Sequence, residues 1–399
     1  MPHASSSRPP DSKPPVEVGW VIVEPIDPMD RGAARAARDR ALEWLEREAP
    51  DFSWSVTLSE REDFSSGPRA APIQLIDLGA FERDAKGWDF TFVITGAELT
   101  GLDRRFALGA TSRCEAIAVA STLRLDPAEG RSDPSEPERR ERLEARLTYL
   151  FLRCFSVLNG LEPMDLGLGP KAIVDCEELD REAALSPGGR GALFQRLWRV
   201  ADPRVEEGQV RHGQLSFYLQ ALRADPRAVP SMVWWARPWL LPLRLGRMTA
   251  AALSVLLVVM LTAEAWELGA TRSLGQVVGV VIVTLVGTVV LVVSRQGLLL
   301  RSSTRLTEQI ALSNVATIIA LALGFVATFA FLFVVALLGA SLVFGEVGAR
   351  WAGVEPLSFG HHLVFAGFSA AVGIVAGALG ASFEESEDFR YIARVDREL

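Results

Sequence analysis

The stretch from residue 248 to residue 383 constrains the fold most, because it is almost free of charged side chains. It contains four apolar runs, and each approaches the roughly 20 residues with which a helix crosses the hydrocarbon core of a bilayer. We expect an all-α membrane domain of four transmembrane helices, at about 248–266, 274–294, 314–338 and 363–383. The 399-residue chain then joins this domain to a charged domain that precedes it.

Arginine residues predict the orientation of these helices. Basic loops are retained on the cytoplasmic side of a membrane, and the arginines gather before the first run and between the second and third, at Arg237, Arg244, Arg247, Arg295, Arg301 and Arg305. The other two loops hold only Arg272 and Arg350. Residues 1–15 lack the apolar core of a secretory signal and are expected to form a disordered tail. We therefore expect a multi-pass protein of the inner (plasma) membrane with both termini in the cytoplasm.

Several residue types in this half have a predicted place in the bilayer. Tryptophan and histidine residues flank the first and fourth runs and are predicted at the membrane interface, namely Trp234, Trp235, Trp239, His361 and His362. Two pairs of glycines one helical turn apart are predicted helix-packing positions, namely Gly275, Gly279, Gly373 and Gly377. Because no ionisable group lies deep within a run, the pattern disfavours an ion carrier.

Residues 16–204 predict an α/β (α+β) cytoplasmic domain. Strand patterns at 16–24, 53–59, 89–99 and within 106–125 alternate with helical patterns at 31–48, 72–88 and 139–158. Residues 205–247 are expected to form an amphipathic, Trp-rich juxtamembrane linker, and residues 384–399 a cytoplasmic tail. Basic charge is almost all arginine, which is typical of GC-rich bacterial coding. The net charge of −8 and the absence of a basic run exclude nucleic acid as a partner.

The helix at 139–158 is the part of this domain that bears most on function. Apolar residues recur along it at three- and four-residue steps, which predicts one buried stripe, at Leu143, Leu147, Leu150, Phe151, Cys154 and Leu158. Asn159 and Gly160 follow as a predicted helix stop, because both residue types tolerate a left-handed backbone.

The motifs around this helix resemble those of the archaemetzincin branch of the metzincin-like zinc peptidases, over roughly residues 16–200. The resemblance rests on four short motifs: Thr95 to Leu99 as Thr-x-x-acidic-Leu, Gly109-Ala110, Ser121-Thr-Leu-Arg124-Leu, and the helix ending Asn-Gly-Leu. Family members carry the zinc motif HExxHxxGxxH on that helix.

With Gly160 as the glycine of that motif, the positions of its ligands and catalytic glutamate hold Arg153, Cys154, Val157 and Pro163. None of these residues can perform the corresponding role. The resemblance therefore implies a pseudo-peptidase fold without a catalytic residue, metal or cofactor. It also implies a sheet edge along which active relatives bind their substrate as an added strand.

We therefore predict a non-catalytic domain that binds or scaffolds a protein or peptide partner beside the lipid bilayer, with homo-oligomerisation as a further option. One alternative is a divergent metal-dependent hydrolase with non-standard ligands, for which Cys114, Cys154, Cys176 and His212 supply suitable atoms. Against it, a cysteine in an apolar stripe is more often a small core residue. A second alternative is a component of a small transporter or channel.

Overall fold

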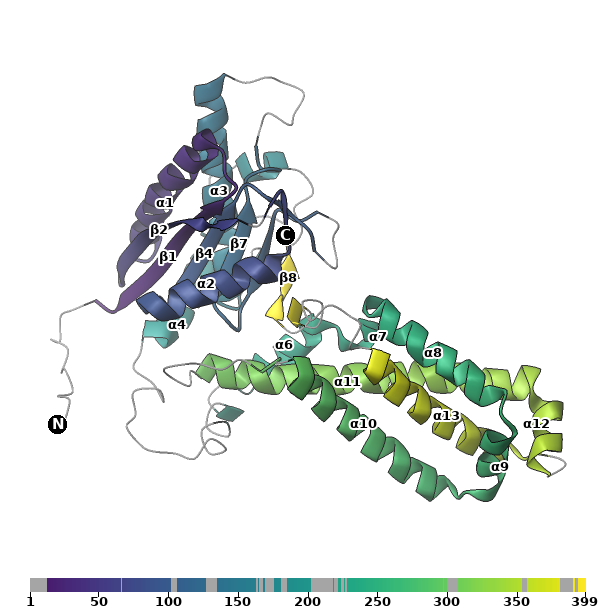
Figure 1. The fold of residues 1–399 in the computed structure, drawn as a ribbon. Helices are drawn as coiled ribbons and strands as arrows, with labels where there is room; N and C mark the ends of the chain where they lie inside the picture. The colour runs from purple at the N-terminus through teal and green to yellow at the C-terminus, as the bar shows by residue number, and fades with distance from the viewer. Residues whose placement is uncertain are drawn as a thin grey trace. The chain divides into compact units, whose positions relative to one another are not determined.

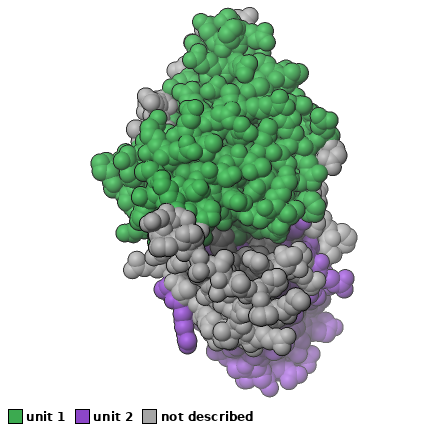
Figure 2. All heavy atoms as spheres, turned by 90° about the vertical axis from the view of Figure 1, so that its left-hand side faces the viewer, with its two compact units in different colours: residues 1–210, 394–399 green, residues 211–393 purple. Residues whose placement is uncertain are grey.

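The computed structural model (Figure 1) describes most of the chain. The described residues are 13–65, 67–101, 106–126, 135–162, 164, 168, 176–180, 185–201, 218, 222–223, 226, 228–296, 298–299, 308–353, 357–380, 390–391 and 394–399. The chain divides into two compact units, one of residues 1–210 with 394–399 and one of residues 211–393 (Figure 2). The first unit therefore includes a segment that the sequence predicted as part of a separate tail.

The first unit is built on a six-stranded mixed sheet in the order β2-β1-β4-β7-β6-β8. The strands β2 (Ser53–Ser65), β1 (Pro15–Glu24), β4 (Phe90–Thr95) and β7 (Ile117–Ser121) are parallel. Two antiparallel strands follow, β6 (Gly109–Ser112) and β8 (Arg397–Glu398). A separate two-stranded sheet pairs β3 (Arg69–Ala70) with β5 (Glu98–Leu99). The predicted α/β fold is confirmed, but residues 106–125 contain two strands where one was expected.

Both faces of the sheet are covered, as the continuous apolar runs of its strands require. Along β1, Trp20 and Ile22 belong to the core beneath α1 (Pro28–Glu48) and α3 (Glu136–Leu158), whereas Val21 and Val23 belong to the core beneath α2 (Pro72–Lys86). This alternation follows from the two-residue period of a strand. The helices η2 (Cys176–Asp180) and α4 (Pro187–Ala201) add Leu179, Leu193 and Leu197 to the core beneath α1 and α3.

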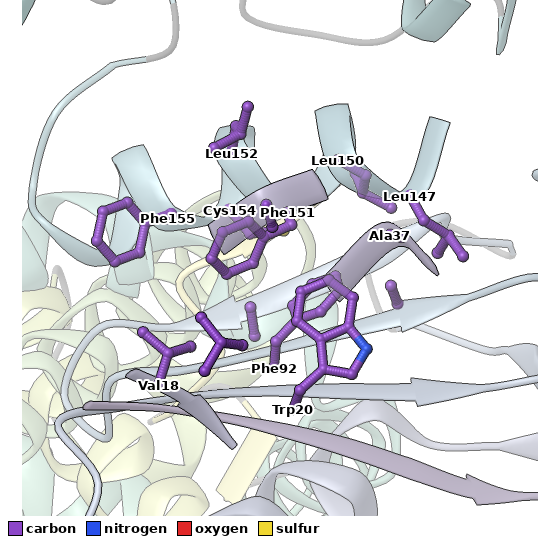
Figure 3. Packing of buried hydrophobic residues seen from close by; sticks show 14 of the residues in the cluster. Val18, Trp20, Ala37, Phe92, Leu147, Leu150, Phe151, Leu152, Cys154 and Phe155 are labelled. Atoms are coloured by element: carbon purple, nitrogen blue, oxygen red, sulfur yellow. The ribbon is translucent and has the colours of Figure 1, made fainter. Parts of the chain in front are cut away.

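An aromatic cluster fixes α3 on the sheet. Figure 3 shows Phe151 and Phe155 of α3 directed toward Val18, Trp20 and Phe92 of the strands. The Phe151 ring lies 5.3 Å from the rings of both Trp20 and Phe92, measured between centroids. Burial of each such ring contributes about 2–3 kcal/mol through the hydrophobic effect. The apolar stripe predicted for this helix is therefore the stripe that packs on β1 and β4.

Both ends of α3 follow from local sequence. The Glu138 carboxylate accepts a hydrogen bond from the backbone N–H of Ser135 at the start, one half of a capping box. At the other end, Asn159 caps the helix and Gly160 adopts a φ of 72°. The Gly160 N–H donates to the carbonyl of Val157, which closes the last turn. The left-handed position explains why a glycine stands there.

The second unit is helical. Its elements are α6 (Ala228–Ala236), η3 (Pro238–Leu240), α7 (Leu241–Arg244), α8 (Gly246–Met260), α9 (Ala263–Thr271), α10 (Leu274–Gln296), α11 (Glu308–Leu338), a π-helical turn (Gly339–Val343), α12 (Gly345–Ala352) and α13 (Phe359–Gly380). Among the described residues, three helical segments are long and apolar enough to cross a membrane: Leu274–Gln296, Ala311–Val343 and Phe359–Gly380. A fourth is formed if Met232–Arg244 and Gly246–Met260, bent by 51°, act as one span.

The first apolar run is shorter than the sequence suggested. The expected span ended at Trp266, but α8 ends at Met260, and Thr262 has an extended backbone that starts α9. The indole N–H of Trp266 donates to the carbonyl of Met260 over 3.0 Å, and the ring stacks on Phe365 of α13 at a centroid distance of 3.9 Å. Trp266 is therefore a core residue of this unit, because its indole hydrogen-bonds a carbonyl at the end of α8 and its ring packs on α13.

Candidate functional site

The positions of the degenerate zinc motif on α3 are buried in the core of the first unit. Arg153 is 1% exposed, and its Nη1 donates to the carbonyl of Leu168 over 3.0 Å. Cys154 is fully buried among the apolar side chains of the core (Figure 3), and Val157 is also buried. Pro163 lies outside the described residues. The side chains of Arg153, Cys154 and Val157 are therefore buried in the packing of the domain.

The cysteines have different surroundings. Burial raises the pKa of the Cys154 thiol to about 12, so a thiolate at neutral pH is strongly disfavoured. The Cys114 sulfur lies 3.1 Å from the hydroxyl of Ser112, and that of Cys176 lies 3.3 Å from the carbonyl of Arg124. His212 lies outside the described residues. Across the part of the chain that is described, no group of three or more His, Cys, Asp or Glu side chains could hold a metal ion.

The edge of β6 carries the feature of this domain that bears most on function. Residues 394–399 run antiparallel to β6, with Glu398 opposite Ala110 and Arg397 opposite Thr111. The N–H of Leu399 donates to the carbonyl of Gly109 over 2.8 Å, and the N–H of Leu108 donates back to Leu399 over 2.8 Å. A third bond joins the N–H of Asp396 to the carbonyl of Thr111 over 2.9 Å. The segment, yellow in Figure 1, thus extends the sheet by one strand.

A carboxylate pocket receives the first side chain of this segment. Arg394 donates through Nε and Nη2 to both carboxylate oxygens of Glu115, the second at 2.6 Å, and through Nη1 to Asp77 at 2.6 Å. Arg394 is 7% exposed and Glu115 is 2% exposed. Burial by itself would lower the pKa of Arg394, but the hydrogen bonds and charges of Glu115 and Asp77 raise it overall. The pocket therefore recognises a permanent, planar cation with a bidentate fork.

Further side chains of the segment are held at separate points. Nη2 of Arg397 donates to the Glu162 carboxylate at 2.9 and 3.0 Å. Leu399, 3% exposed, belongs to the core beneath α1 and α3, whereas Val395 packs on the core beneath α2. The segment is therefore bound by backbone hydrogen bonds, by two arginines and by two apolar side chains.

Burial disfavours the charged form of Asp396, and its partners do not fully compensate. Its carboxylate accepts a hydrogen bond from the backbone N–H of Arg113. Burial raises the pKa of Asp396, and the charge of Arg113 and its backbone N–H offset only part of this rise. A partly buried carboxylate of this kind resists ionisation, which makes it a pH-sensitive point of the site.

The sequence did not reveal this site. Residues 394–399 were predicted as part of a tail, because two paired strand residues are too few to show a strand period. Glu115 carried a usable signal, since it stands directly before the buried run Ala116-Ile-Ala-Val-Ala-Ser121. A charge next to a buried strand requires a buried partner, and this requirement predicts an ion pair although not its location.

A second polar group lies where β1 and β7 end. Asp30, 6% exposed, has a pKa raised by burial and partly lowered by a hydrogen bond from Thr122. Beside it, Arg139 of α3 donates through Nε and Nη2 to both oxygens of Asp126, the first at 2.6 Å. These contacts connect the end of β7 to α3. Their geometry is that of a structural ion pair between two elements.

The predicted packing and interface residues of the second unit differ in their surroundings. A Cβ atom at Gly373 would lie 3.3 Å from the carbonyl of Ala252, and one at Gly377 would lie 3.2 Å from the Cβ of Ala252, so α13 approaches α8 closely. A Cβ atom at Gly275 or Gly279 of α10 would meet no other atom within 4 Å, and the packing role of these two glycines stays a prediction.

The interface residues lie mainly at helix ends. Trp234 and Trp239 are 69% and 46% exposed, and the side chain of Trp235 is not among those described. His361 lies in the first turn of α13, with Nδ1 3.2 Å from the Ser358 hydroxyl, and His362 follows it. Their place in the bilayer remains a prediction.

Comparisons with known proteins find one distant structural likeness. No known protein family and no curated protein matches the sequence. The crystal structure of archaemetzincin from Methanopyrus kandleri matches 46% of this chain and 95% of its own, at 17% identity and a TM-score of 0.35. The fold class of the first unit, a mixed α/β sheet domain, rests on the strand order described above.

Proposed function

We propose that the chain is a membrane-anchored binding protein whose α/β domain holds an extended segment of a partner polypeptide at the edge of β6. The observation that carries this proposal is the antiparallel addition of residues 394–399 to that edge. The domain accepts a strand from a distant part of the chain, so the surface and pockets that recognise a strand are already formed.

Strand addition suits recognition of a peptide because affinity and specificity come from different groups. Backbone hydrogen bonds from Leu108, Gly109 and Thr111 supply affinity that does not depend on the ligand's sequence. Specificity comes from side-chain pockets, here the Glu115 and Asp77 carboxylates. The core positions on α3 contribute no reactive group to this site, which favours a binding role over hydrolysis.

The pairing of β8 with β6 also bears on membrane topology. Residues 1–210 and 394–399 form one folded unit, so both lie on one side of any bilayer that the second unit crosses. The chain between them must then cross an even number of times. Three of its helical segments are long enough by themselves, and a fourth requires α8 with the bent helix before it. We therefore propose that the second unit crosses the inner membrane four times. The distribution of arginine favours a cytoplasmic location for the first unit.

Peptide binding to the full chain in lipid nanodiscs tests the proposed function. In the test variant, residues 394–399 are replaced by six Gly and Ser residues, and the probe is the fluorescent peptide Arg-Val-Asp-Arg-Glu-Leu with one photoreactive residue. We expect saturable binding and cross-links to residues 108–113, against weaker binding of a peptide with the same composition in scrambled order. Absence of saturable binding, with the circular dichroism of the chain unchanged, would contradict the proposal.

Cysteine labelling in intact cells tests the topology. In a Cys176→Ser background, Ser273→Cys lies between α9 and α10 and is expected to react with a membrane-impermeant maleimide. Gln296→Cys, at the far end of α10, is its matched control and is expected to react only after permeabilisation. Labels introduced near residues 17 and 393 on opposite sides of the membrane would exclude an even number of crossings.

A further inference from the structure

We infer that the β6 edge selects a basic partner segment with the pattern Arg-aliphatic-x-Arg-x-Leu, and that residues 394–399 occupy this site as an internal competitor of that partner. The inference rests on the proposed function and adds to it the chemistry of the partner and the way in which access is controlled.

The charged side chains around the β6 edge determine the sign of the charge that a partner segment must carry. Three carboxylates, from Asp77, Glu115 and Glu162, accept hydrogen bonds from the two arginines of the segment. Glu115 is almost fully buried, so a ligand that does not bring a cation to it leaves an uncompensated charge. An acidic or neutral segment is therefore rejected at this position, which is a stronger basis for specificity than the attraction of a basic one.

The spacing of the partner follows from the positions of the pockets. The first arginine and the aliphatic residue after it match Arg394 and Val395, which contact Glu115 and the core beneath α2. The second arginine lies three residues after the first, opposite Glu162, and the leucine lies two residues further, in the core beneath α1 and α3. The last leucine anchors the strand because its side chain is 3% exposed when bound.

Access is controlled because the occupant belongs to the same chain. A ligand that belongs to the same chain as its binding site competes at an effective concentration on the order of millimolar. A partner must then either bind much more tightly than residues 394–399 or arrive when that segment has left the edge. Weakening the internal segment is expected to strengthen partner binding without any change in the pocket.

Peptide variants test the specificity, with the full chain in nanodiscs carrying the Gly and Ser replacement of residues 394–399. Citrulline at the first position of Arg-Val-Asp-Arg-Glu-Leu keeps the shape of arginine and removes its charge. We expect this change to weaken binding by about 30-fold or more, because it leaves Glu115 buried without a cation. Citrulline at the fourth position, opposite the more exposed Glu162, is the matched control and is expected to weaken binding by about fivefold or less. Equal binding of the first-position variant and the parent peptide would overturn the proposed specificity.

The unreplaced chain and its Arg394→Ala variant test the competition. We expect the unreplaced chain to require at least tenfold more peptide than the replaced chain, and Arg394→Ala to recover most of that difference. Equal affinity for both chains would overturn internal competition, while binding by neither would instead contradict the proposed function itself. A dimer of the unreplaced chain that the peptide dissociates would also overturn the inference, by assigning the edge to the segment of a second copy.

Discussion

The guanidinium of Arg394 donates to both carboxylate oxygens of Glu115, a residue 279 positions earlier in the chain. Both side chains are buried, and Asp77 accepts a further hydrogen bond from Nη1 of Arg394. This ion pair joins the segment after the last long helix to the turn before β7. Its removal therefore tests how firmly residues 394–399 are held.

Arg394→Ala is expected to release the segment from the sheet. Removal of one partner of a buried ion pair costs about 3–5 kcal/mol, which corresponds to hydrogen exchange at the Leu399 and Asp396 amides about 100-fold faster or more. Arg35→Ala is the control, since Arg35 also makes a two-bond contact, with Glu60, but is 53% exposed. We expect the control to change stability by less than about 1 kcal/mol. Similar exchange rates in the two variants would contradict the assigned role of Arg394.

Acidification from neutral pH toward 3.8 is expected to strengthen the contribution of Asp396 to docking. Its pKa in the folded state is raised above 3.8 by burial, so its stabilising effect is complete below 3.8 and is lost as the pH rises through the folded value. Arg113, Glu115 and Arg397 are the charged groups that act on it.

Asp396→Asn is the matched variant, because an amide oxygen can still accept the hydrogen bond from Arg113. The measurement is the opening free energy of the segment by hydrogen exchange, corrected for the intrinsic rate. We expect the variant to dock more firmly than the parent chain at pH 7 and to depend less on pH. A parent chain that docks less firmly at pH 5, while Asp396→Asn is unaffected, would contradict this assignment.

The three thiols are expected to react at different rates with a thiol reagent at pH 8. Cys176 is partly exposed, whereas Cys114 and Cys154 are buried, and the pKa of Cys154 is raised to about 12. The thiolate is the reactive form, so Cys154 should react only after unfolding. Mass spectrometry of the labelled peptides, with and without denaturant, gives the order. Rapid labelling of Cys154 in the folded chain would contradict this expectation and would support a role for Cys154 as a metal ligand or nucleophile.

Gly19→Ala is expected to destabilise the first unit by more than about 2 kcal/mol. A Cβ atom at Gly19 would lie 1.9 Å from Cε3 of the buried Trp88 ring, which cannot move without displacing the core beneath α2. Gly188→Ala in the first turn of α4 is the control, because a Cβ there meets open space and alanine favours a helix. Thermal unfolding of both variants checks this difference, and a Gly19→Ala chain as stable as the control would show that Trp88 can shift.

The elements with strong local periodicity were the ones that the sequence could predict. The apolar run of β1 and the stripe of α3 each specify their own buried faces, because alternation and helical spacing are local properties. The hairpin of β6 and β7 was missed because β6 has only four residues. The end of α8 at Met260 was missed because no glycine or proline marks it. The indole of Trp266 stabilises the break, and its stacking partner Phe365 lies about a hundred residues further along the chain.

The candidate site could not be located from the sequence because its two halves are separated by the whole second unit. The contact of Arg394 with Glu115 depends on long-range closure, and no local pattern encodes which carboxylate a given arginine will meet. Cys154 shows the opposite case. Its place in the apolar stripe already favoured a core role, and its complete burial in the structure agrees with that interpretation.

The position of residues 394–399 in the sheet also sets an order of events during synthesis. The ribosome makes Glu115 and Arg394 279 residues apart, an interval of roughly 15–55 s at ordinary translation rates. Throughout that interval the β6 edge has no strand of its own to pair with and Glu115 has no arginine. Closure of the edge therefore follows synthesis of residues 211–393, so the sheet of the first unit is completed only after the second unit has been made.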